Sequence, residues 1–143
     1  MMKSAQKYVL GCLTLYDVFS VKWLKFVGVE VVLSGETVLG SDNLLTTLQS
    51  FGETYFVSFG LSITKHTPEW RNVIHLSRGS ENSEYGDRVP AVYITPDNKL
   101  EISSGVNGNK AFGFQSGQLV VNQWYQIQIE QVLSDGKVIL ILL

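Results

Sequence analysis

The sequence has little of three features that would narrow its function. Its one cysteine, Cys12, cannot form an internal disulfide, so no bridge points to an oxidising compartment. Its 11 Lys and Arg are scattered singly among 13 Asp and Glu, which leaves no basic stripe to neutralise a nucleic-acid backbone. Its apolar runs fall short of the roughly 20 residues that a membrane-spanning helix needs. We therefore expect neither a nucleic-acid partner nor a membrane span.

What the sequence does contain is a two-residue alternation typical of half-buried strands. From Tyr55 to Ile63 the odd positions are apolar, and most positions between them are small or polar. Segments of this kind recur between turn residues, and 143 residues with 13 glycines and three prolines suit one all-β domain. The pattern predicts an antiparallel two-sheet sandwich with one core.

Turn signals divide the second half of the chain. Thr95-Pro96-Asp97-Asn98 predicts a type I turn, because proline presets its second position and Asp and Asn tolerate the backbone conformations of the next two. Gly105 to Gly113 is predicted to be a glycine-rich connection, and its Asn107-Gly108 pair is a strong hairpin signal. Ser77 to Arg88 is the longest polar stretch, and we expect a functional loop there.

The two ends of the chain allow alternative interpretations. Residues 1–28 resemble either a degraded secretory signal or an amphipathic helix, so we place the sandwich at residues 29–143. Val138 to Leu143 is apolar throughout, and an apolar strand at an open edge would invite aggregation. Either this strand inserts between others, or the natural domain continues and is incomplete here at its C-terminus.

Several short motifs resemble those of one known family in their order and spacing. They are Tyr55-Phe-Val-Ser-Phe59, Trp70 with Asn72-Val-Ile-His-Leu76, Glu84-Tyr-Gly-Asp-Arg-Val-Pro90, Val106-Asn-Gly-Asn-Lys110, Asn122-Gln-Trp124 and Ile127-Gln-Ile129. Together they resemble a laminin G-like domain of the concanavalin A-like lectin and glucanase superfamily. The resemblance implies a jelly-roll sandwich in a secreted or cell-surface protein, where it binds glycans or matrix proteins and sometimes calcium.

The resemblance places candidate binding residues in two rim loops. The ligand-binding candidates are Glu84, Tyr85, Asp87, Arg88, Asn107 and Asn109, and the calcium candidates are Asp87 and Asn107. Ordinary turn chemistry explains the same residue types, since Asp and Asn stabilise turns and Asn tolerates left-handed backbone. Both interpretations stay open at this stage.

Catalysis is not expected, because glycosidase chemistry needs two carboxylates about 5 to 9 Å apart. Glu101 and Glu130 each lack a carboxylate at the alternate positions of their predicted strands. His66 and His75 have no partners at metal-binding spacing, so zinc has little support. We expect Trp70 and Trp124 in the core.

The sequence thus favours a non-enzymatic recognition or adhesion domain, extracellular or on the cell surface, within a larger protein. Its expected ligand is a glycan or a matrix protein bound through the rim loops, with calcium as a candidate ion. The alternative is a truncated or degenerate sandwich without independent function. A glycoside hydrolase is the third interpretation, and it would depend on Glu101 or Glu130.

Overall fold

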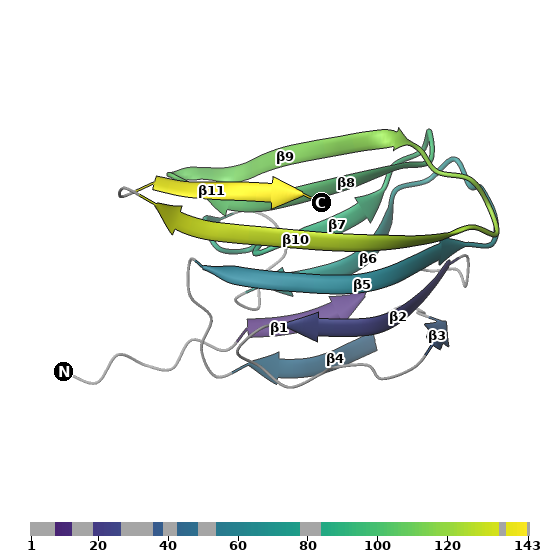
Figure 1. Cartoon of the computed structure of the whole chain (residues 1–143), viewed down its shortest axis with the longest axis horizontal. Helices are drawn as coiled ribbons and strands as arrows, with labels where there is room; N and C mark the ends of the chain where they lie inside the picture. Colours follow the sequence, from purple (N-terminus) through teal and green to yellow (C-terminus); the bar gives the residue numbers. More distant parts are fainter. Residues whose placement is uncertain are drawn as a thin grey trace.

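Two antiparallel sheets make up the described part of this computed structural model (Figure 1). The structure describes residues 8–12, 19–26, 36–38, 43–48, 54–77, 84–134 and 137–142, with side chains over 54–77 and 84–132. These ranges contain strands and turns and no helix. Accordingly, none of the described residues forms a helix that could span a bilayer.

The first sheet, sheet A, has six strands, and the second, sheet B, has five. The order in sheet A is β4 (Asn43–Leu48), β1 (Tyr8–Cys12), β6 (Arg71–Ser77), β7 (Ala91–Ile94), β8 (Lys99–Val106) and β9 (Asn109–Gln118). The order in sheet B is β11 (Lys137–Leu142), β10 (Trp124–Ser134), β5 (Tyr55–Ile63), β2 (Phe19–Phe26) and β3 (Glu36–Val38). In Figure 1 sheet B runs across the front of the molecule and sheet A lies behind it.

One apolar core lies between the sheets. Strand β5 shows the predicted alternation, with its odd positions from Tyr55 to Ile63 buried and Phe56 and Ser58 half-exposed. Its inner side chains belong to one buried cluster with residues of β6, β7 and β8 from sheet A and with Ile127 and Ile129 of β10. Burial of these side chains is the main favourable contribution to folding.

A short chain of hydrogen bonds crosses this core. The Tyr55 hydroxyl of sheet B lies 2.8 Å from Ser104 Oγ of sheet A, which donates to Gln131 Oε1 of sheet B at 2.7 Å. Since the single serine proton goes to Gln131, Tyr55 donates to Ser104. All three residues are buried, and burial raises the pKa of the Tyr55 phenol, so it stays protonated.

Both predicted turns are confirmed. Asn98 donates its backbone N–H to the Thr95 carbonyl at 2.9 Å, which closes the turn between β7 and β8. Asn107 and Gly108 have φ values of 50° and 81°, and Val106 pairs with Asn109 across them. Two successive positive φ values are those of a type I′ hairpin turn, the turn for which Asn-Gly is preferred.

The described part of the N-terminal segment consists of strands, which differs from the amphipathic helix that was one of the two interpretations of its sequence. Residues Tyr8–Cys12 and Phe19–Phe26 are strands β1 and β2, and they pair within sheets A and B respectively. The apolar residues at helical spacing that suggested this helix include aromatic and β-branched residues, which favour strands when partner strands are available. The described strands of the sandwich therefore begin well before residue 29, whereas residues 1–7 and 27–35 lie outside the described residues.

Two further features of the strands differ from what the sequence suggests, namely the insertion of the C-terminal strand, which was one of two alternatives, and the connection from Gly105 to Gly113. Among the described strands β11 pairs with β10 alone, so the apolar C-terminal strand lies at an edge of sheet B instead of inside it. The β10–β11 hairpin, with Ser134 opposite Lys137, fixes it there. Gly105 to Gly113 is no open connection either, because β8 continues to Val106 and β9 starts at Asn109.

The two faces of β5 give a direct test of the core. Replacing Phe59, which is fully buried, with alanine should lower the free energy of unfolding by about 3–5 kcal/mol, because it leaves a cavity. Phe56→Ala on the outward side of the same strand is the matched control and should cost clearly less. Urea unfolding of both variants measures the difference. Equal losses would contradict the assigned inner face.

Candidate functional site

The two predicted loops lie at the same end of sheet A. The segment from Glu84 to Pro90 enters β7 beside the end of β8, where Gly105 donates its N–H to the Arg88 carbonyl at 2.9 Å. The same segment is tied to β6, since Val89 N–H donates to the Leu76 carbonyl at 2.9 Å. The Asn107-Gly108 turn follows directly after β8. Residues 78–83 of the predicted loop lie outside the described residues.

Asp87 makes hydrogen bonds within its own loop. Its side chain is 3% exposed, and Oδ2 accepts the backbone N–H of Glu84 at 2.9 Å. The Asp87 N–H donates to the Glu84 carbonyl at 3.2 Å, and the Asp87 carbonyl lies within hydrogen-bond distance of His75 Nε2. These contacts support the turn interpretation of Asp87.

The asparagines of the hairpin also perform turn chemistry. Asn107 occupies a left-handed position, and Asn109 Oδ1 accepts the Ala111 N–H at 3.0 Å. Both side chains are exposed, in contrast to Asp87. Within residues 54–77 and 84–132, no three His, Cys, Asp or Glu side chains come together in a way that could hold a metal ion. A calcium site built on Asp87 and Asn107 stays a prediction.

An aromatic and cationic band crosses the outer face of sheet A next to these loops. We define the Tyr85–Trp70 band as Tyr85, Arg88, Tyr93 and Trp70. The Arg88 guanidinium carbon lies 5.9 Å from the centre of the Tyr93 ring, and Nη1 donates to Ser103 Oγ at 3.4 Å. The Tyr93 and Trp70 rings meet edge to face, with centroids 6.1 Å apart and planes at 83°. These are attractive geometries for a cation and for aromatic pairs.

Strand register explains why the band faces outward. Val92 and Ile94 point into the core, so Tyr93 between them points away from it, and Glu101 lies directly opposite Tyr93 on β8. At the loop end of the band, the Tyr85 ring covers Gly105, where an added Cβ would lie 3.5 Å from Tyr85 Cε2. The loop and the outer face of sheet A therefore form one continuous surface.

The electrostatics of the band favour a neutral phenol beside a cation. Burial raises the pKa of Tyr93, and the nearby Arg88 lowers it in part. Glu101, on the neighbouring strand, also raises it and accepts a hydrogen bond from Gln115 Nε2 at 3.2 Å. The tyrosine hydroxyl is thus a hydrogen-bonding group at neutral pH, and Arg88 supplies the positive charge.

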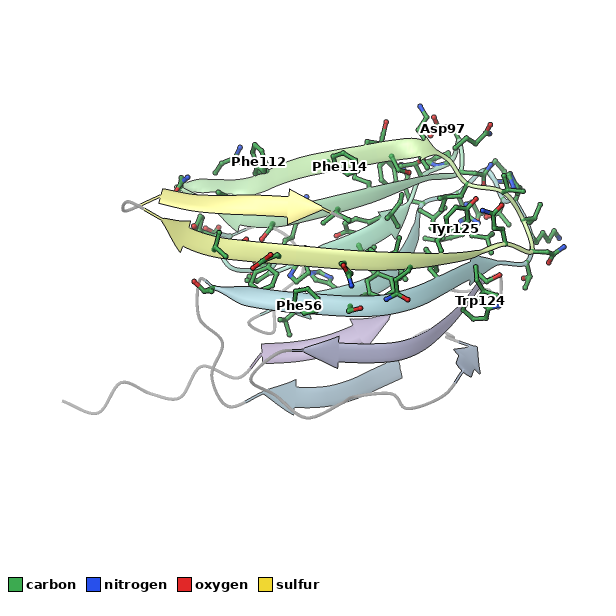
Figure 2. All side chains as sticks on the ribbon, viewed as in Figure 1. Phe56, Asp97, Phe112, Phe114, Trp124 and Tyr125 are labelled. Carbon is green, nitrogen blue, oxygen red and sulfur yellow. The ribbon has the colours of Figure 1, made fainter. Side chains whose placement is uncertain are left out.

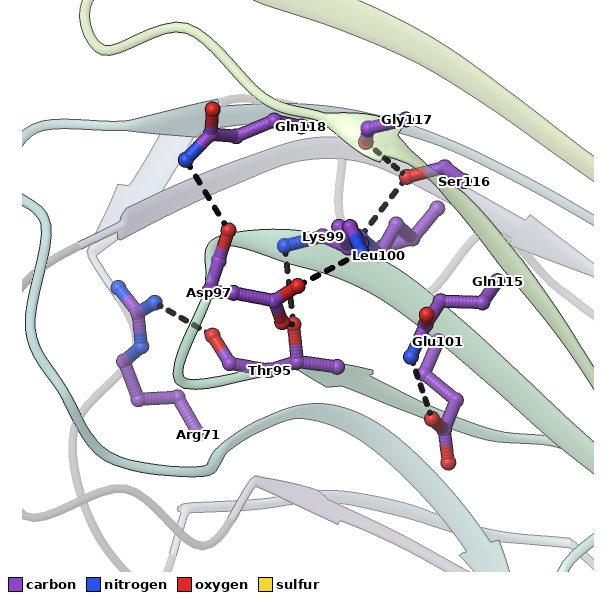
Figure 3. A network of polar contacts seen from close by, with 10 residues as sticks. All are labelled: Arg71, Thr95, Asp97, Lys99, Leu100, Glu101, Gln115, Ser116, Gly117 and Gln118. Carbon is purple, nitrogen blue, oxygen red and sulfur yellow. Dashed lines mark hydrogen bonds and ion pairs between the residues drawn. The ribbon is translucent and has the colours of Figure 1, made fainter.

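Arg71 anchors the far end of the band, because it directly follows Trp70 in the chain. Its side chain is 1% exposed, and its guanidinium donates to Asn98 Oδ1 at 2.8 Å, the Lys65 carbonyl at 3.2 Å and the Thr95 carbonyl at 3.4 Å. Figure 3 shows Arg71 reaching this turn. Burial lowers the pKa of Arg71, an effect that Glu69 partly offsets.

The turn that receives Arg71 is itself cross-linked. Thr95 Oγ1 donates to Asp97 Oδ1 at 2.5 Å, and Lys99 Nζ lies 2.7 Å from Asp97 Oδ2 (Figure 3). The contacts with Lys99 and Thr95 lower the pKa of Asp97. Gln118 at the end of β9 donates to the Asp97 carbonyl at 3.2 Å, which ties the turn to the next strand. The turn that holds the Arg71 side chain, next to Trp70, is therefore fixed by contacts from several segments.

Both tryptophans that we expected in the core are exposed. Trp70 is 58% and Trp124 38% exposed. Trp124 precedes Tyr125, Ile127 and Ile129 on β10, and since these face inward it lies at the outward parity, as Figure 2 shows beside β5. A regular strand would place Trp70 on the same face as the buried Ile74, four residues later. The irregular register between Asn72 and Ile74 breaks this alternation, so Trp70 can face outward.

Nothing in the sequence around Tyr93 marked it as a candidate binding residue. It sits in the middle of a four-residue strand of otherwise buried residues. Only the inward parity of its neighbours Val92 and Ile94 could have indicated that it faces outward.

Asp87 offers a test that separates turn chemistry from ion binding. Asp87→Ala removes the acceptor for the Glu84 N–H and should lower the free energy of unfolding by about 1 kcal/mol. Asp87→Asn keeps an acceptor oxygen and should lose less. Both losses should be the same with and without millimolar calcium in a thermal melt followed by circular dichroism. A loss that grows in calcium would instead support a cation site.

Comparison with known proteins leaves these observations without a named relative. No family model, curated protein or solved structure matches the chain. The laminin G-like resemblance therefore stays a prediction that rests on the short motifs and their order.

Proposed function

We propose that this chain is a non-enzymatic recognition domain that binds a glycan through the Tyr85–Trp70 band and the adjoining loop. The observation that carries the proposal is the arrangement of Trp70, Tyr93 and Arg88. The exposed Trp70 ring packs edge to face on the Tyr93 ring, and the Arg88 guanidinium lies over the same tyrosine ring. The proposal includes the jelly-roll form of the sandwich and a place outside the cell or on its surface, within a larger protein.

The chemistry of the band suits a sugar chain. An aromatic face packs against the apolar face of a pyranose ring, and Trp70 is the most exposed of the large apolar side chains described. Arg88 brings several N–H donors for hydroxyl, carboxylate or sulfate oxygens. Tyr93, which is partly exposed, adds a hydroxyl group beside it, and the buried Ser103 holds the guanidinium in place. A row of stacking and hydrogen-bonding groups recognises a polyhydroxy chain without any bond being broken.

The placement of Glu101 and Glu130 supports the non-enzymatic part of the proposal. Glu101 lies opposite Tyr93 on the outer face of sheet A. Glu130 lies opposite Phe56 on the outer face of sheet B, since its neighbours Ile129 and Gln131 are buried. The two carboxylates that the sequence offered thus face away from each other across the whole core. They cannot act together at the distance that glycoside hydrolysis needs.

Substitution of the band tests the proposal. On a glycan array with a parallel panel of matrix proteins, Trp70→Ala and Arg88→Gln should each weaken binding by about tenfold or more, because each removes a principal contact. Trp124→Ala is the matched control, since it removes an exposed tryptophan from the other sheet and should leave binding unchanged. Urea unfolding of each variant checks that the fold is kept.

Three outcomes would contradict this function in different ways. No binding by the folded chain to any glycan or matrix protein would remove the proposal. Binding that is lost with Trp124→Ala and kept with Trp70→Ala would move the site to sheet B. Band-dependent binding to a matrix protein alone would keep the surface and overturn the ligand class.

A further inference from the structure

Strand β9 carries an apolar ledge at the side of the molecule. Phe112 and Phe114 lie opposite Ser104 and Ile102 of β8, both of which are buried toward the core. Directly opposite residues of an antiparallel pair point to the same face, so both phenylalanines project toward the core side of sheet A. They are nevertheless 47% and 43% exposed. Figure 2 shows the two side by side along β9.

The ledge exists because sheet A extends beyond sheet B on this side. The edge strand of sheet B, β11, makes its close backbone approaches to sheet A at β8. The exposure of Phe112 and Phe114 shows that the inner side of β9 is incompletely covered. Two adjacent, partly exposed aromatic side chains form an apolar patch of the kind that marks an interaction surface.

The same strand has an open backbone edge with little protection. Among the described strands only β8 pairs with β9. Residues 111–118 contain neither a charged residue nor a proline, which are two of the devices that block pairing at a sheet edge. Irregular register marks both ends of the β8–β9 ladder, and the stretch from Phe112 to Gln115 between them is regular. This stretch can accept another strand.

We propose that β9 pairs with β9 of a second copy of this chain, antiparallel and around a two-fold axis at Gly113. Antiparallel pairing of one strand with itself is what a two-fold axis generates. With the axis at Gly113 and perpendicular to the sheet, Phe112 lies opposite Phe114 of the second copy, and Phe114 opposite Phe112. Such cross-strand aromatic pairs are favourable, and they bring both ledges together.

Charge favours a second copy over a different partner. Self-pairing puts two copies of the same sequence side by side, so a charged residue near the axis would lie close to the same charge on the second copy and be repelled by it. The nearest charge on β9 is Lys110, which this register places opposite the uncharged Ser116. The eight residues after Lys110 carry none. The strand is therefore compatible with itself over the whole pairing region, and it offers no charge for a charged partner to recognise.

A charge at Gly113 would test the interface without disturbing the single chain. A Cβ built there meets nothing closer than the Ile102 carbonyl oxygen at 3.4 Å, an ordinary contact. Gly113→Lys would put two like charges directly opposite each other only when β9 pairs with β9 at this register. Gly113→Glu does the same with the opposite sign, and a mixture of the two variants would bring unlike charges together.

Sedimentation velocity of the full chain from about 1 to 100 µM measures the result. The unmodified chain should sediment as a dimer of twice the 15.9 kDa chain mass at the upper concentrations. Each charged variant alone should be monomeric, with its dissociation constant raised by more than about tenfold, and an equal mixture should recover the dimer. Val120→Lys adds the same charge at an exposed position outside β9 and should leave the dimer intact.

Other results overturn the proposal. A chain that stays monomeric at 100 µM has no such interface. A dimer that survives both Gly113→Lys and Gly113→Glu uses another surface. Unfolding curves of the variants must match that of the unmodified chain. If they do not, Phe114→Ser, which removes one aromatic of each cross-strand pair without adding charge, replaces them and should weaken the dimer in the same assay.

Discussion

The contact between the inner faces of the two sheets is the constraint on which everything else in this molecule depends. Each strand buries the side chains of one face in the core. Because successive side chains point to opposite faces, the alternate residues then lie on the surface. Tyr93 faces outward because Val92 and Ile94 are needed inside, and Trp124 because Ile127 and Ile129 are. The candidate binding surface is thus a by-product of the way in which the core is filled.

Much of the fold could be predicted from sequence where the signal is local. The alternation of β5, the turn at Thr95 to Asn98 and the Asn107-Gly108 hairpin depend only on neighbouring residues, and the structure has all three. The N-terminal strands were missed because an apolar stripe of helical spacing also contains strand-forming residues. Only pairing partners far along the chain, such as β4 and β6 for β1, decide between the two.

The candidate site was predictable only in part, and for similar reasons. Sequence indicated the loop from Glu84 to Arg88, and Arg88 does lie in the band. It did not indicate Trp70, because one irregularity in the register of β6 reverses the face of every residue before it. Nor did it separate Phe112 and Phe114 from core residues, since whether such side chains are covered depends on how far the opposite sheet extends.

The polar chain of Tyr55, Ser104 and Gln131 has a mechanical consequence. Dispersion and hydrophobic contacts have no direction of their own, so packed apolar faces resist sliding only through the interlocking shapes of their side chains. The hydrogen bonds from Tyr55 to Ser104 and from Ser104 to Gln131 join the two sheets directionally, and moving one sheet past the other would break both of them. These hydrogen bonds therefore help to keep the outer faces of the two sheets aligned, and a force that a ligand exerts on sheet A is passed through Ser104 to β5 and β10 of sheet B.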